Sequence, residues 1–545
     1  MHKMKRLCRQ WDIFGVGSAV ALLFVLAPLA TIALYLFSPP SDAWAHVREH
    51  LLRRSVVNTA LLIFSVAALS GVIGLLGAYA TSRYEFFGRK KLSWMLILPL
   101  GVPSYIVAYM YADMFSHTGS ATRFLRRFGI EHSLEVMSLP GATFVFVITL
   151  FPYVYLLVQS ALKRQSASFL ESAKLLGASP VRRFFTVVLP LLRPALVAGT
   201  LLVVLETLSD YGVVSYFNVR VLSLSIFDAW FRLGDVDAAV RISAVMLLLV
   251  FAVIFVERFL RGRRRYGFNA SPRPIPRVKP SKAKRIAISL SLWLLFGIAF
   301  LVPLGQLLYY AYLSYDGALG MNTLYLVVNT LSLALASTLL TVLVALILAN
   351  FARGRSGNAK RAFLKLSTLG YAVPGAVLAI AVMLVSLRLD GWLHPLYRFA
   401  SSESGRLILT GSLLMLGFAF LVRFMAIAFN AIEASYDKVG DSYTEASRTL
   451  GVSKLKTLVK VDLPLIRFGL ISAFIIVFID ILKELPITLI LSPSNYETLA
   501  SQVHRYAREE MLQESSVPSL IIIAISSVMI YFLTHMKKEG VPNVR

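Results

Sequence analysis

The hydrophobic positions of the chain fall into twelve long runs, and short polar segments separate one run from the next. A helix needs about 20 mainly apolar residues to cross the hydrocarbon core of a bilayer, and each run contains enough of them. The pattern therefore predicts an all-α polytopic membrane protein with twelve transmembrane helices. The predicted spans are residues 12–37, 55–81, 92–115, 140–162, 191–217, 238–260, 285–312, 325–351, 365–388, 407–430, 468–491 and 516–534.

One polar segment occurs twice in this pattern, each time after four spans. Glu171–Pro190 reads ESAKLLGASPVRRFFTVVLP, and Glu445–Pro464 reads EASRTLGVSKLKTLVKVDLP. In each copy a glycine follows the glutamate by six residues, and a Leu-Pro pair ends the segment thirteen residues after that glycine. Two copies at identical spacing, 274 residues apart, predict two homologous halves of six helices each.

Smaller repeats support the duplication and help to place the boundaries of the halves. Asn58-Thr59 and Val102-Pro103 recur 271 residues later as Asn329-Thr330 and Val373-Pro374. The prediction is a first half at residues 1–262 with its polar loop at 163–190, a linker at 263–284, and a second half at 285–545 with its loop at 437–464. The linker is basic and rich in proline, which predicts an extended tether with little packing.

Each copy of the polar segment contains start and stop signals for two short helices. Ser168 and Ser442 precede the glutamates by three residues, which is the spacing of a capping box. Gly177 and Gly451 follow about two turns later, where a left-handed residue can end a helix. Ser179-Pro180 predicts the start of a second helix, and the second copy repeats the serine. The Leu-Pro pair then predicts a break before the next span.

The spacing Glu-Ala-Ala, three residues, Gly, nine residues, Ile-x-Leu-Pro resembles the signature loop of permease subunits of bacterial ABC importers. The first copy departs from it at Ser172 and Val187 and the second at Ser447 and Val461, all small-for-small or branched-for-branched exchanges. The resemblance implies a type I ABC importer permease-like fold, in which the first helix of each loop is a coupling helix seated in a groove of an ATPase subunit. The residues that it assigns to coupling are Glu171, Ala173, Gly177, Leu189, Pro190, Glu445, Ala446, Gly451, Leu463 and Pro464.

The same resemblance implies the partners of the chain. Because both loops lie in one chain, it implies two copies of an ABC ATPase subunit, together with an extracytoplasmic solute-binding protein. ATP and Mg²⁺ would be used by the ATPase, and this chain would bind no cofactor. The sequence contains no Gly-x-x-x-x-Gly-Lys-Ser/Thr phosphate loop, no His-Glu-x-x-His and no nucleophile elbow, so we expect a transport subunit and not an enzyme. An ion-coupled secondary transporter would also lack these motifs and is the alternative from a different class.

The distribution of basic residues then predicts the orientation of the chain across the membrane. The formal net charge is +26, although charged residues make up only 15% of the chain and apolar residues 57%. The basic residues gather in alternate loops, as the positive-inside rule requires, and they form no basic stripe with interleaved aromatic residues that would predict nucleic-acid binding. We therefore predict a multi-pass protein of the bacterial inner membrane, with both termini and both polar loops in the cytoplasm and the basic linker against membrane lipid.

Three further segments narrow the substrate by resemblance. Glu206–Phe217 (ETLSDYGVVSYF), Ala229–Asp235 (AWFRLGD) and Asp480–Leu491 (DILKELPITLIL) resemble ferric-iron permeases among the fused twelve-span forms. This implies a permease for ferric iron delivered by a periplasmic binding protein. Fused thiamine permeases share the architecture, so thiamine or another small solute is the alternative substrate.

Four of the acidic residues inside predicted spans form two pairs that lie 274 residues apart. They are Glu206, Asp210, Asp480 and Glu484. The four-residue spacing predicts that each pair shares a helix face, and ionisable groups inside a membrane usually face a cavity or a partner. Hard carboxylate oxygens suit a hard cation, so we hypothesise that these residues help ferric ion through the protein, without assigning a metal site. The alternative is that Lys483, Arg423 and backbone groups simply pair these acids near helix ends.

Overall fold

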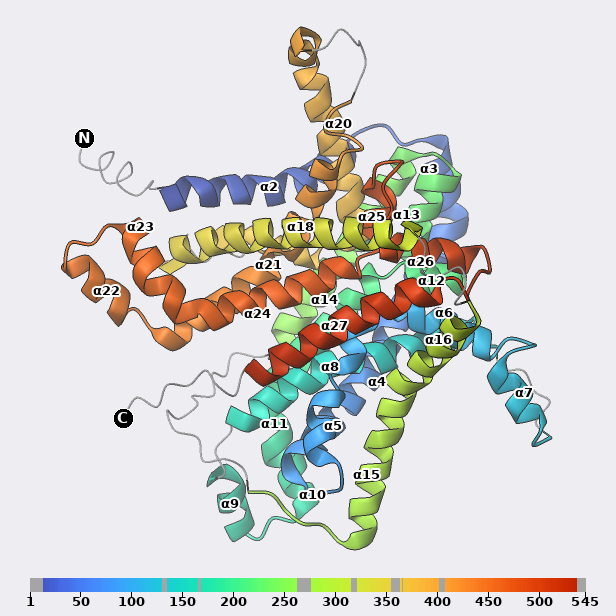
Figure 1. Cartoon of the computed structure of the whole chain (residues 1–545), viewed down its shortest axis with the longest axis vertical. Helices are drawn as coiled ribbons and strands as arrows, with labels where there is room; N and C mark the ends of the chain where they lie inside the picture. The colour runs from blue at the N-terminus through green and yellow to red at the C-terminus, as the bar shows by residue number, and fades with distance from the viewer. Residues whose placement is uncertain are drawn as a thin grey trace.

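The structure is a computed structural model, and it describes residues 13–129, 135–164, 168–261, 276–314, 321–353, 363–364, 366–400 and 407–536. Over these residues the chain is helical, with one isolated β-bridge (Figure 1). Within the same ranges eleven helices are long and apolar enough to cross a membrane, and a pair of helices bent against each other brings the number to twelve. The predicted class, an all-α polytopic membrane protein, is confirmed.

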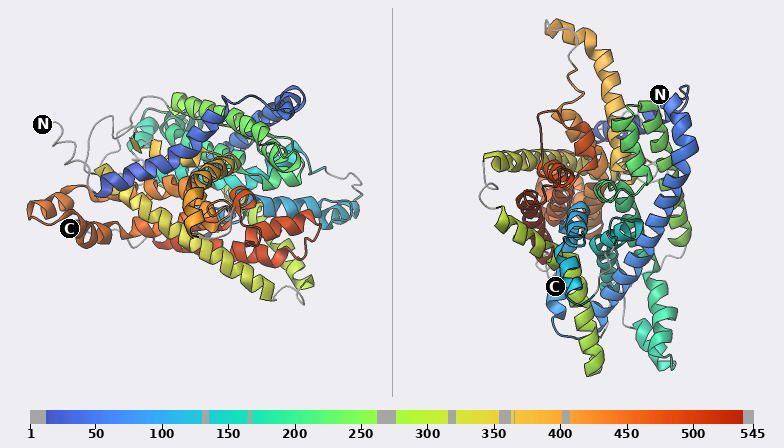
Figure 2. Two further views of the ribbon diagram at one scale, coloured as in Figure 1. Left: turned by 90° about the horizontal axis from the view of Figure 1, so that it is seen from above. Right: turned by 90° about the vertical axis from the view of Figure 1, so that its right-hand side faces the viewer.

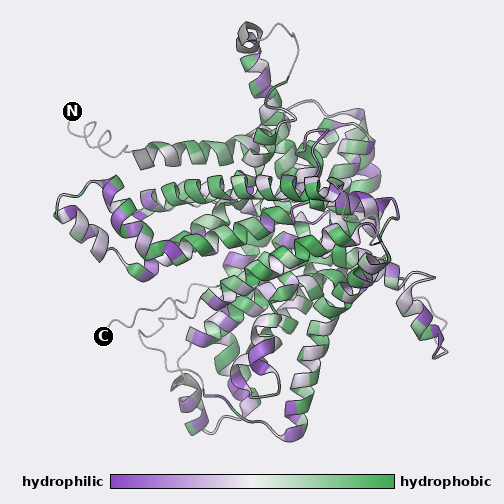
Figure 3. Ribbon diagram, in the orientation of Figure 1, coloured by the Kyte–Doolittle hydropathy of each residue, from purple (hydrophilic) through white to green (hydrophobic). Residues whose placement is uncertain are grey.

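Most of the long helices follow the predicted runs. The long helices are α2 (Ile13–Tyr35), α4 (Leu52–Arg83), α8 (Leu139–Arg164), α11 (Leu189–Ser209), α14 (Val236–Arg261), α15 (Lys282–Phe296), α16 (Val302–Leu313), α18 (Met321–Arg353), α20 (Gly375–Ala400), α21 (Leu413–Val439), α24 (Leu463–Leu482) and α27 (Ser516–Met536). Helices α15 and α16 together form the seventh span, but the helix of the ninth span, α20, begins ten residues later and ends twelve residues later than the predicted span 365–388. Hydrophobic residues cover their central parts, and polar residues gather at the short helices near the ends of the bundle (Figure 3).

Shorter elements connect these helices. They are α3 (Asp42–His46), α5 (Arg89–Met95), α6 (Ser104–Met114), α7 (Ser120–Arg126), α9 (Ser168–Leu175), α10 (Pro180–Arg183), α12 (Gly212–Tyr216), α13 (Leu222–Phe227), α22 (Ser442–Thr449), α23 (Lys454–Thr457), α25 (Pro486–Leu491) and α26 (Leu499–Arg508). Five single π-helical turns and two 3₁₀ turns lie among them: η1 (Val47–Leu51), η3 (Phe184–Val188), η4 (Asp228–Arg232), η5 (Gly297–Leu301), η7 (Leu458–Asp462), η2 (Leu98–Gly101) and η6 (Leu369–Ala372).

Each half is built on three helices that pack together. In the first half these are α4, α8 and α11, and in the second half their equivalents α18, α21 and α24 (Figure 1). The contact in the first half is close, because a Cβ at Gly74 or Gly199 would lie 2.6 or 2.8 Å from atoms of Val154. Small residues that let helix backbones approach are what holds helices together in lipid, where there is little hydrophobic drive.

The first span of each half packs on the other half. Helix α2 contacts α18 and α20 of the second half, and α15 and α16 contact α5 and α6 of the first half. Figure 2 shows the resulting interleaving of the N-terminal blue helix with the yellow and orange helices. The two halves are therefore intertwined and do not lie side by side as separate bundles.

Three of the predicted spans, the third, the fifth and the eleventh, are each broken into two helices in the structure. The third is a pair, Arg89–Gly101 and Ser104–Met114, bent by 91° where Pro103 holds the preceding residue Val102 in an extended conformation. The fifth and eleventh end at Ser209 and Leu482, and short helices continue after a break of two or three residues. Apolar runs alone do not reveal such breaks, because the hydrophobicity continues through them.

The linker also differs from its prediction where it is described. Residues 263–275 lie outside the described residues, but Arg277 and Val278 pack against the end of α4, and α15 already begins at Lys282. The end of the linker is therefore attached to the first half, although the sequence predicted little packing. The boundaries proposed for the halves stay a prediction.

Candidate functional site

The two polar loops form the same structure. In each, the glycine has a positive φ, +76° at Gly177 and +78° at Gly451. The amide of that glycine donates to a carbonyl three residues back, and the next amide donates to a carbonyl five residues back, at 3.0 and 3.1 Å in the first loop and 3.0 and 3.2 Å in the second. This is the Schellman motif, and it confirms that the glycines end α9 and α22.

The predicted N-terminal caps are only partly present. Ser442 is the first residue of α22, and its N-cap is Asp441, which makes no side-chain cap hydrogen bond, so the Ser442–Glu445 capping box is wrong. Helix α9 likewise begins with Ser168 as its first residue, and the residue before it lies outside the described residues. Asp441 instead pairs with Arg353 at 2.7 Å, which explains why it is not free to cap.

The second short helix of each loop begins where predicted, after Ser179 or Ser453, but it does not end where predicted. Ser179 caps α10 by accepting from the amide of Arg182 at 3.3 Å, as predicted, whereas Ser453 makes no such bond. The Leu-Pro pairs do not break the chain either, since α10 continues through η3 into α11 as one helix of 30 residues, and α23 continues through η7 into α24.

A π-helical turn makes this continuity possible. A proline inside a helix lacks an amide donor and its ring collides with the carbonyl four residues earlier. In both loops the five residues before Leu189 or Leu463 form a π turn, and the leucine amide reaches back five residues, to Phe184 or Leu458. The wider turn shifts the hydrogen-bond register just before Pro190 or Pro464, so the helix absorbs the proline.

Both loops present an exposed apolar edge that the sequence analysis did not single out. Leu175 and Leu176 are 89% and 87% exposed at the end of α9, and Leu450, which is equivalent to Leu176, is 83% exposed. Glu171 and Glu445 are also exposed and have no ion pair among the described residues. The sequence feature that indicates this exposed edge is a leucine directly before the glycine in both repeats. Exposed apolar residues of this kind mark a surface for a partner.

The two loops lie on the same side of the molecule. Figure 1 shows α9 and α22 on the side where α2 begins and α27 ends, while α12, α13 and α26 lie at the opposite end of the bundle. The second loop is held more firmly, because Arg353 pairs with Asp462 at 2.9 Å and Thr444 donates to the same carboxylate at 2.7 Å. At the position equivalent to Asp462 the first loop has Val188.

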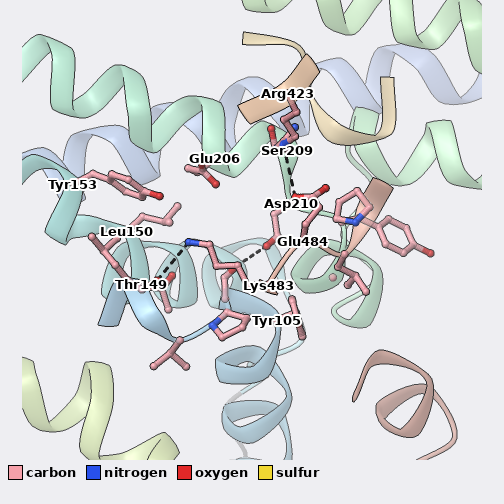
Figure 4. Close-up of a pocket in the computed structure, with 18 residues that line it drawn as sticks. Tyr105, Thr149, Leu150, Tyr153, Glu206, Ser209, Asp210, Arg423, Lys483 and Glu484 are labelled. Atoms are coloured by element: carbon pink, nitrogen blue, oxygen red, sulfur yellow. Dashed lines mark hydrogen bonds and ion pairs between the residues drawn. The ribbon is translucent and has the colours of Figure 1, made fainter. Parts of the chain in front are cut away.

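Between the halves lies a small cavity of about 70 Å³ (Figure 4). The share of one water in the liquid is about 30 Å³, so this space holds about two waters. Its polar lining comes from both halves: Ser104, Tyr105, Thr149, Tyr153, Glu206, Ser209, Asp210, Tyr211, Arg423, Lys483 and Glu484. Fragments that are far apart in sequence meet here because α11 and α24 both break at this depth.

Three of the four predicted acids, Glu206, Asp210 and Glu484, line this cavity, and Asp480 pairs with Lys483, which also lines it, but the acids do not form two helix faces. Asp210 and Glu484 lie just beyond the ends of α11 and α24, so neither shares a helix with its predicted pair-mate. That part of the prediction is wrong, because Asp210 has an extended backbone with ψ at 132° and accepts from the Val213 amide at 2.8 Å. No group of three or more Asp, Glu, His or Cys side chains in the described ranges is placed to hold a metal ion.

The acids of the second half are paired with bases. Lys483 lies 2.9 Å from Asp480, and Arg423 lies 3.6 Å from Glu484. The alternative that these acids are simply paired near helix ends therefore describes the second half correctly. Removing one partner of such a buried pair costs about 3–5 kcal/mol, because it leaves the other charge buried without compensation.

The acids of the first half have neutral partners. Tyr371 of the second half donates to Glu206 at 2.7 Å, and Ser104 donates to Asp210. The repeat offset of 274 places Thr149 where the second half has Arg423, and Ser209 where it has Lys483. The second half therefore has two bases that the first half lacks, and the cavity is lined by three carboxylates and two basic groups.

Aromatic side chains connect this cavity to a second one of about 390 Å³, lined by α12, α13, η4 and α26. Tyr211 lines both cavities and stacks on Phe227, with ring centres 3.6 Å apart. Tyr109 packs 4.5 Å from Tyr216 and lies 2.6 Å from the Nδ1 atom of His504. Tyr211 therefore lies between the central cavity and the cavity at the end of the molecule opposite the loops.

A duplicated helical bundle with two matching loops at one end and a small charged cavity at the joint of its halves has the organisation of a membrane permease. The family model described as binding-protein-dependent transport system inner membrane component matches residues 71–265 and 341–538, so the chain belongs to this family. It is the non-catalytic permease subunit of an ABC importer, a multi-pass protein of the inner membrane. Permeases of this family work with a separate ABC ATPase and a binding protein.

Known relatives are similar over different lengths. The Fe(3+)-transport system permease protein FbpB 2 of Haemophilus influenzae is 24% identical over 482 residues, covering 87% of this chain and 88% of that protein. The ferric transport system permease protein FbpB of Actinobacillus pleuropneumoniae is 23% identical, covering 96% and 78%. The sulfate transport system permease protein CysT of Salmonella typhimurium is 31% identical over 266 residues, covering 46% of this chain and 93% of that protein.

Proposed function

We propose that this chain is the permease of a ferric-iron importer. The observation that carries the proposal is the central cavity, where carboxylates outnumber basic groups and where, among the described residues, Glu206 and Asp210 accept hydrogen bonds from hydroxyl and amide groups. Such a site favours a hard cation over a neutral solute. The ferric permeases that resemble this chain over most of its length support the same substrate.

The proposal gives the two halves different tasks. The acids of the second half are neutralised by their own bases and hold the joint together, so the first half supplies the oxygens that meet the cation. The cavity is too small for more than about two waters, so iron passes only when the halves move apart. In the closed form, the tyrosine layer at Tyr211 and Tyr109 blocks one side of the route.

The matching loops would supply that movement. We place α9 and α22 against two copies of a partner ATPase in the cytoplasm, with Glu171 and Glu445 facing basic groups and Leu176 and Leu450 buried in the contact. Gly177, Gly451 and the other residues assigned to coupling form the cap and the continuous helix behind it. Because α10–η3–α11 and α23–η7–α24 are unbroken, a shift of either loop is transmitted to the ends of α11 and α24 at the cavity.

The test is ferric uptake by proteoliposomes that contain the permease, its ATPase and its binding protein. We expect Glu206→Gln with Asp210→Asn to lower uptake at least about tenfold, a loss of roughly 1.4 kcal/mol in stabilisation of the cation. Binding-protein-stimulated ATP hydrolysis should stay near wild type, since the loops are untouched. These amides keep the size of the side chains, and Tyr371 and Ser104 keep hydrogen-bond acceptors.

The matched control is Glu206→Asp with Asp210→Glu, which keeps both charges and should retain more uptake than the amide variant. Amide substitution of Asp480 and Glu484 is less informative, because it leaves Lys483 and Arg423 buried without their partners. Wild-type ferric uptake by a folded Glu206→Gln, Asp210→Asn protein would contradict the cation path.

An oxyanion is the second candidate substrate. Arg423 and Lys483 also line the cavity, and a sulfate permease is 31% identical over 46% of the chain. The same vesicles supplied with labelled sulfate distinguish the two: sulfate uptake that survives the amide substitutions and falls in Arg423→Gln would assign the oxyanion and not iron.

A further inference from the structure

The end of the linker is fastened to the loop that follows α4. The Glu85 amide donates to Val278 at 3.0 Å, and the Val278 amide donates to Arg83 at 2.9 Å, so two strands of chain lie parallel for one residue pair. The Arg83 guanidinium also donates to the carbonyl of Pro276. This attachment brings the basic start of the second half against the first half, on the side of the molecule that carries α9 (Figure 1).

Some of the charged side chains around this attachment have ion-pair partners and others do not. Glu85 is paired twice, with Arg89 at 3.0 Å and with Arg277 at 3.3 Å. Lys284 lies 3.5 Å from the Tyr84 hydroxyl and 4.9 Å from the centre of its ring. The side chains of Lys279 and Arg285 are exposed and have no hydrogen bond or ion pair to the parts of the chain that the structure describes. Two cations are therefore available beside a carboxylate that is already neutralised.

Between these two cations lies a cavity of about 880 Å³ with mostly apolar walls. It is lined by Glu85, Phe86, Phe87, Lys279, Arg285, Ile286, Ser289, Leu290 and Trp293. Ile286 and Leu290 are four residues apart on one face of α15, and both are exposed, Leu290 to 66%. Phe87 is 81% exposed across from them. In a membrane-spanning helix such a face meets lipid, so the cavity is open to the bilayer.

We propose that this cavity binds one phospholipid with an anionic headgroup. Lys279 and Arg285 hold the phosphate, and an acyl chain lies along Phe87, Ile286 and Leu290. A basic rim over an apolar, lipid-facing wall at the end of a span complements both parts of such a molecule. A soluble phosphate would meet the same two cations but would leave the apolar walls uncovered, which is why the occupant is a lipid.

The bound lipid would join the two halves. Its headgroup contacts the linker and α15 of the second half, while its chain covers Phe86 and Phe87 of the first half. The lipid thus adds to the backbone pairing at Val278 and strengthens the contact between α15 and α5. This inference concerns a lipid site and is independent of the identity of the transported substrate.

The experiment is native mass spectrometry of the purified chain titrated with phosphatidylglycerol or phosphatidylcholine. Each cation near a membrane surface adds about 1 kcal/mol, so two cations correspond to a preference of about 30-fold for phosphatidylglycerol in the wild type. Lys279→Ala with Arg285→Ala should bind both lipids equally. The control Lys90→Ala with Lys91→Ala removes two exposed cations of the nearby α5 that do not line the cavity, and it should keep the preference.

A second variant tests the apolar wall. Leu290→Asn should weaken phosphatidylglycerol binding while it leaves both cations in place. Equal binding of the two lipids by the wild type would overturn the proposal, as would a preference that survives removal of both cations. Displacement of bound phosphatidylglycerol by millimolar inorganic phosphate would also overturn it, since that result assigns a soluble anion to the site.

Discussion

Glu206 and Asp480 occupy equivalent positions in the two halves, yet their surroundings differ. Asp480 lies 2.9 Å from a lysine, and Glu206 accepts a hydrogen bond from the tyrosine of the opposite half. The two copies differ at the positions of these partners: serine stands at 209 against lysine at 483, and Leu100 is equivalent to Tyr371. At the scale of residues, the two copies of the repeat therefore differ in whether the acid meets a basic group or a hydroxyl group.

His504 on α26 is a second residue whose surroundings decide its chemistry. It is buried at the interface of the halves, near Tyr109, Tyr211 and Arg508. Burial lowers the pKa of His504 to about 4, and the positive charge of Arg508 adds to the effect. The ordinary pKa of histidine is about 6.5, so the unfolded chain binds this proton more readily than the folded one.

We therefore predict an acid-sensitive fold. The stabilisation from neutral His504 is fully present above about pH 6.5 and is lost as the pH falls towards 4, on the order of 2–3 kcal/mol near pH 4.5. Thermal unfolding in detergent between pH 7.5 and 4.5 should show a steeper loss of Tm for the wild type than for His504→Gln. The exposed His117→Gln should behave as the wild type, and parallel curves for all three proteins would contradict the assignment.

At the scale of elements, each polar loop combines a Schellman cap with a π turn that absorbs a proline. The glycines and the Leu-Pro pairs were visible in the sequence, but their consequences differed. A glycine ends a helix through its own backbone freedom, which is a local property. A proline breaks a helix only when the clash of its ring with the preceding turn is not relieved. Here the preceding turn widens to a π turn and relieves that clash.

The glycines that end α9 and α22 lead to a prediction about binding of the partner ATPase. Proline cannot adopt a φ near +76°, so Gly177→Pro with Gly451→Pro should disrupt the ends of α9 and α22. We expect co-purification of the partner ATPase to fall by about tenfold or more and uptake to be lost, because the exposed leucines beside the caps move. Gly129→Pro is the matched control, since Gly129 has the same φ of +76° beyond α7, on the other side of the molecule. Undiminished ATPase binding by the double variant would rule out docking at these loops.

At the scale of the whole molecule, the two halves exchange their first spans. Helix α2 lies against α18 and α20, while α15 and α16 lie against elements of the first half. The sequence predicted two equivalent halves joined by a tether, and that description is incomplete because each half is covered by a helix of the other. Large hydrophobic side chains are exposed along α4, α15 and α18.

This exchange predicts that the linker peptide is not what holds the halves together. Residues 1–268 and 269–545 expressed as two chains should assemble, because their contacts bury α2 and α15 on the opposite fragment. Affinity purification through a tag on one fragment should recover the other in about equal amount. A first fragment that starts at residue 40 and so lacks α2 should recover less. Fragments that do not co-purify would show that covalent linkage is required.

The sequence by itself determined the class of the protein, the number of spans, the duplication and the glycine ends of the two loops. The spans follow from local composition, because a bilayer imposes their length and apolarity; the duplication follows from the match between two segments; and the glycine ends follow because glycine adopts a positive φ without steric cost. Only the tertiary structure decided the bent third span, the breaks at Asp210 and Glu484, the exchange of first spans and the pairing of acids with bases. These features depend on which residues of distant segments contact one another, and neither the repeats nor the hydrophobic runs of the sequence predict those contacts.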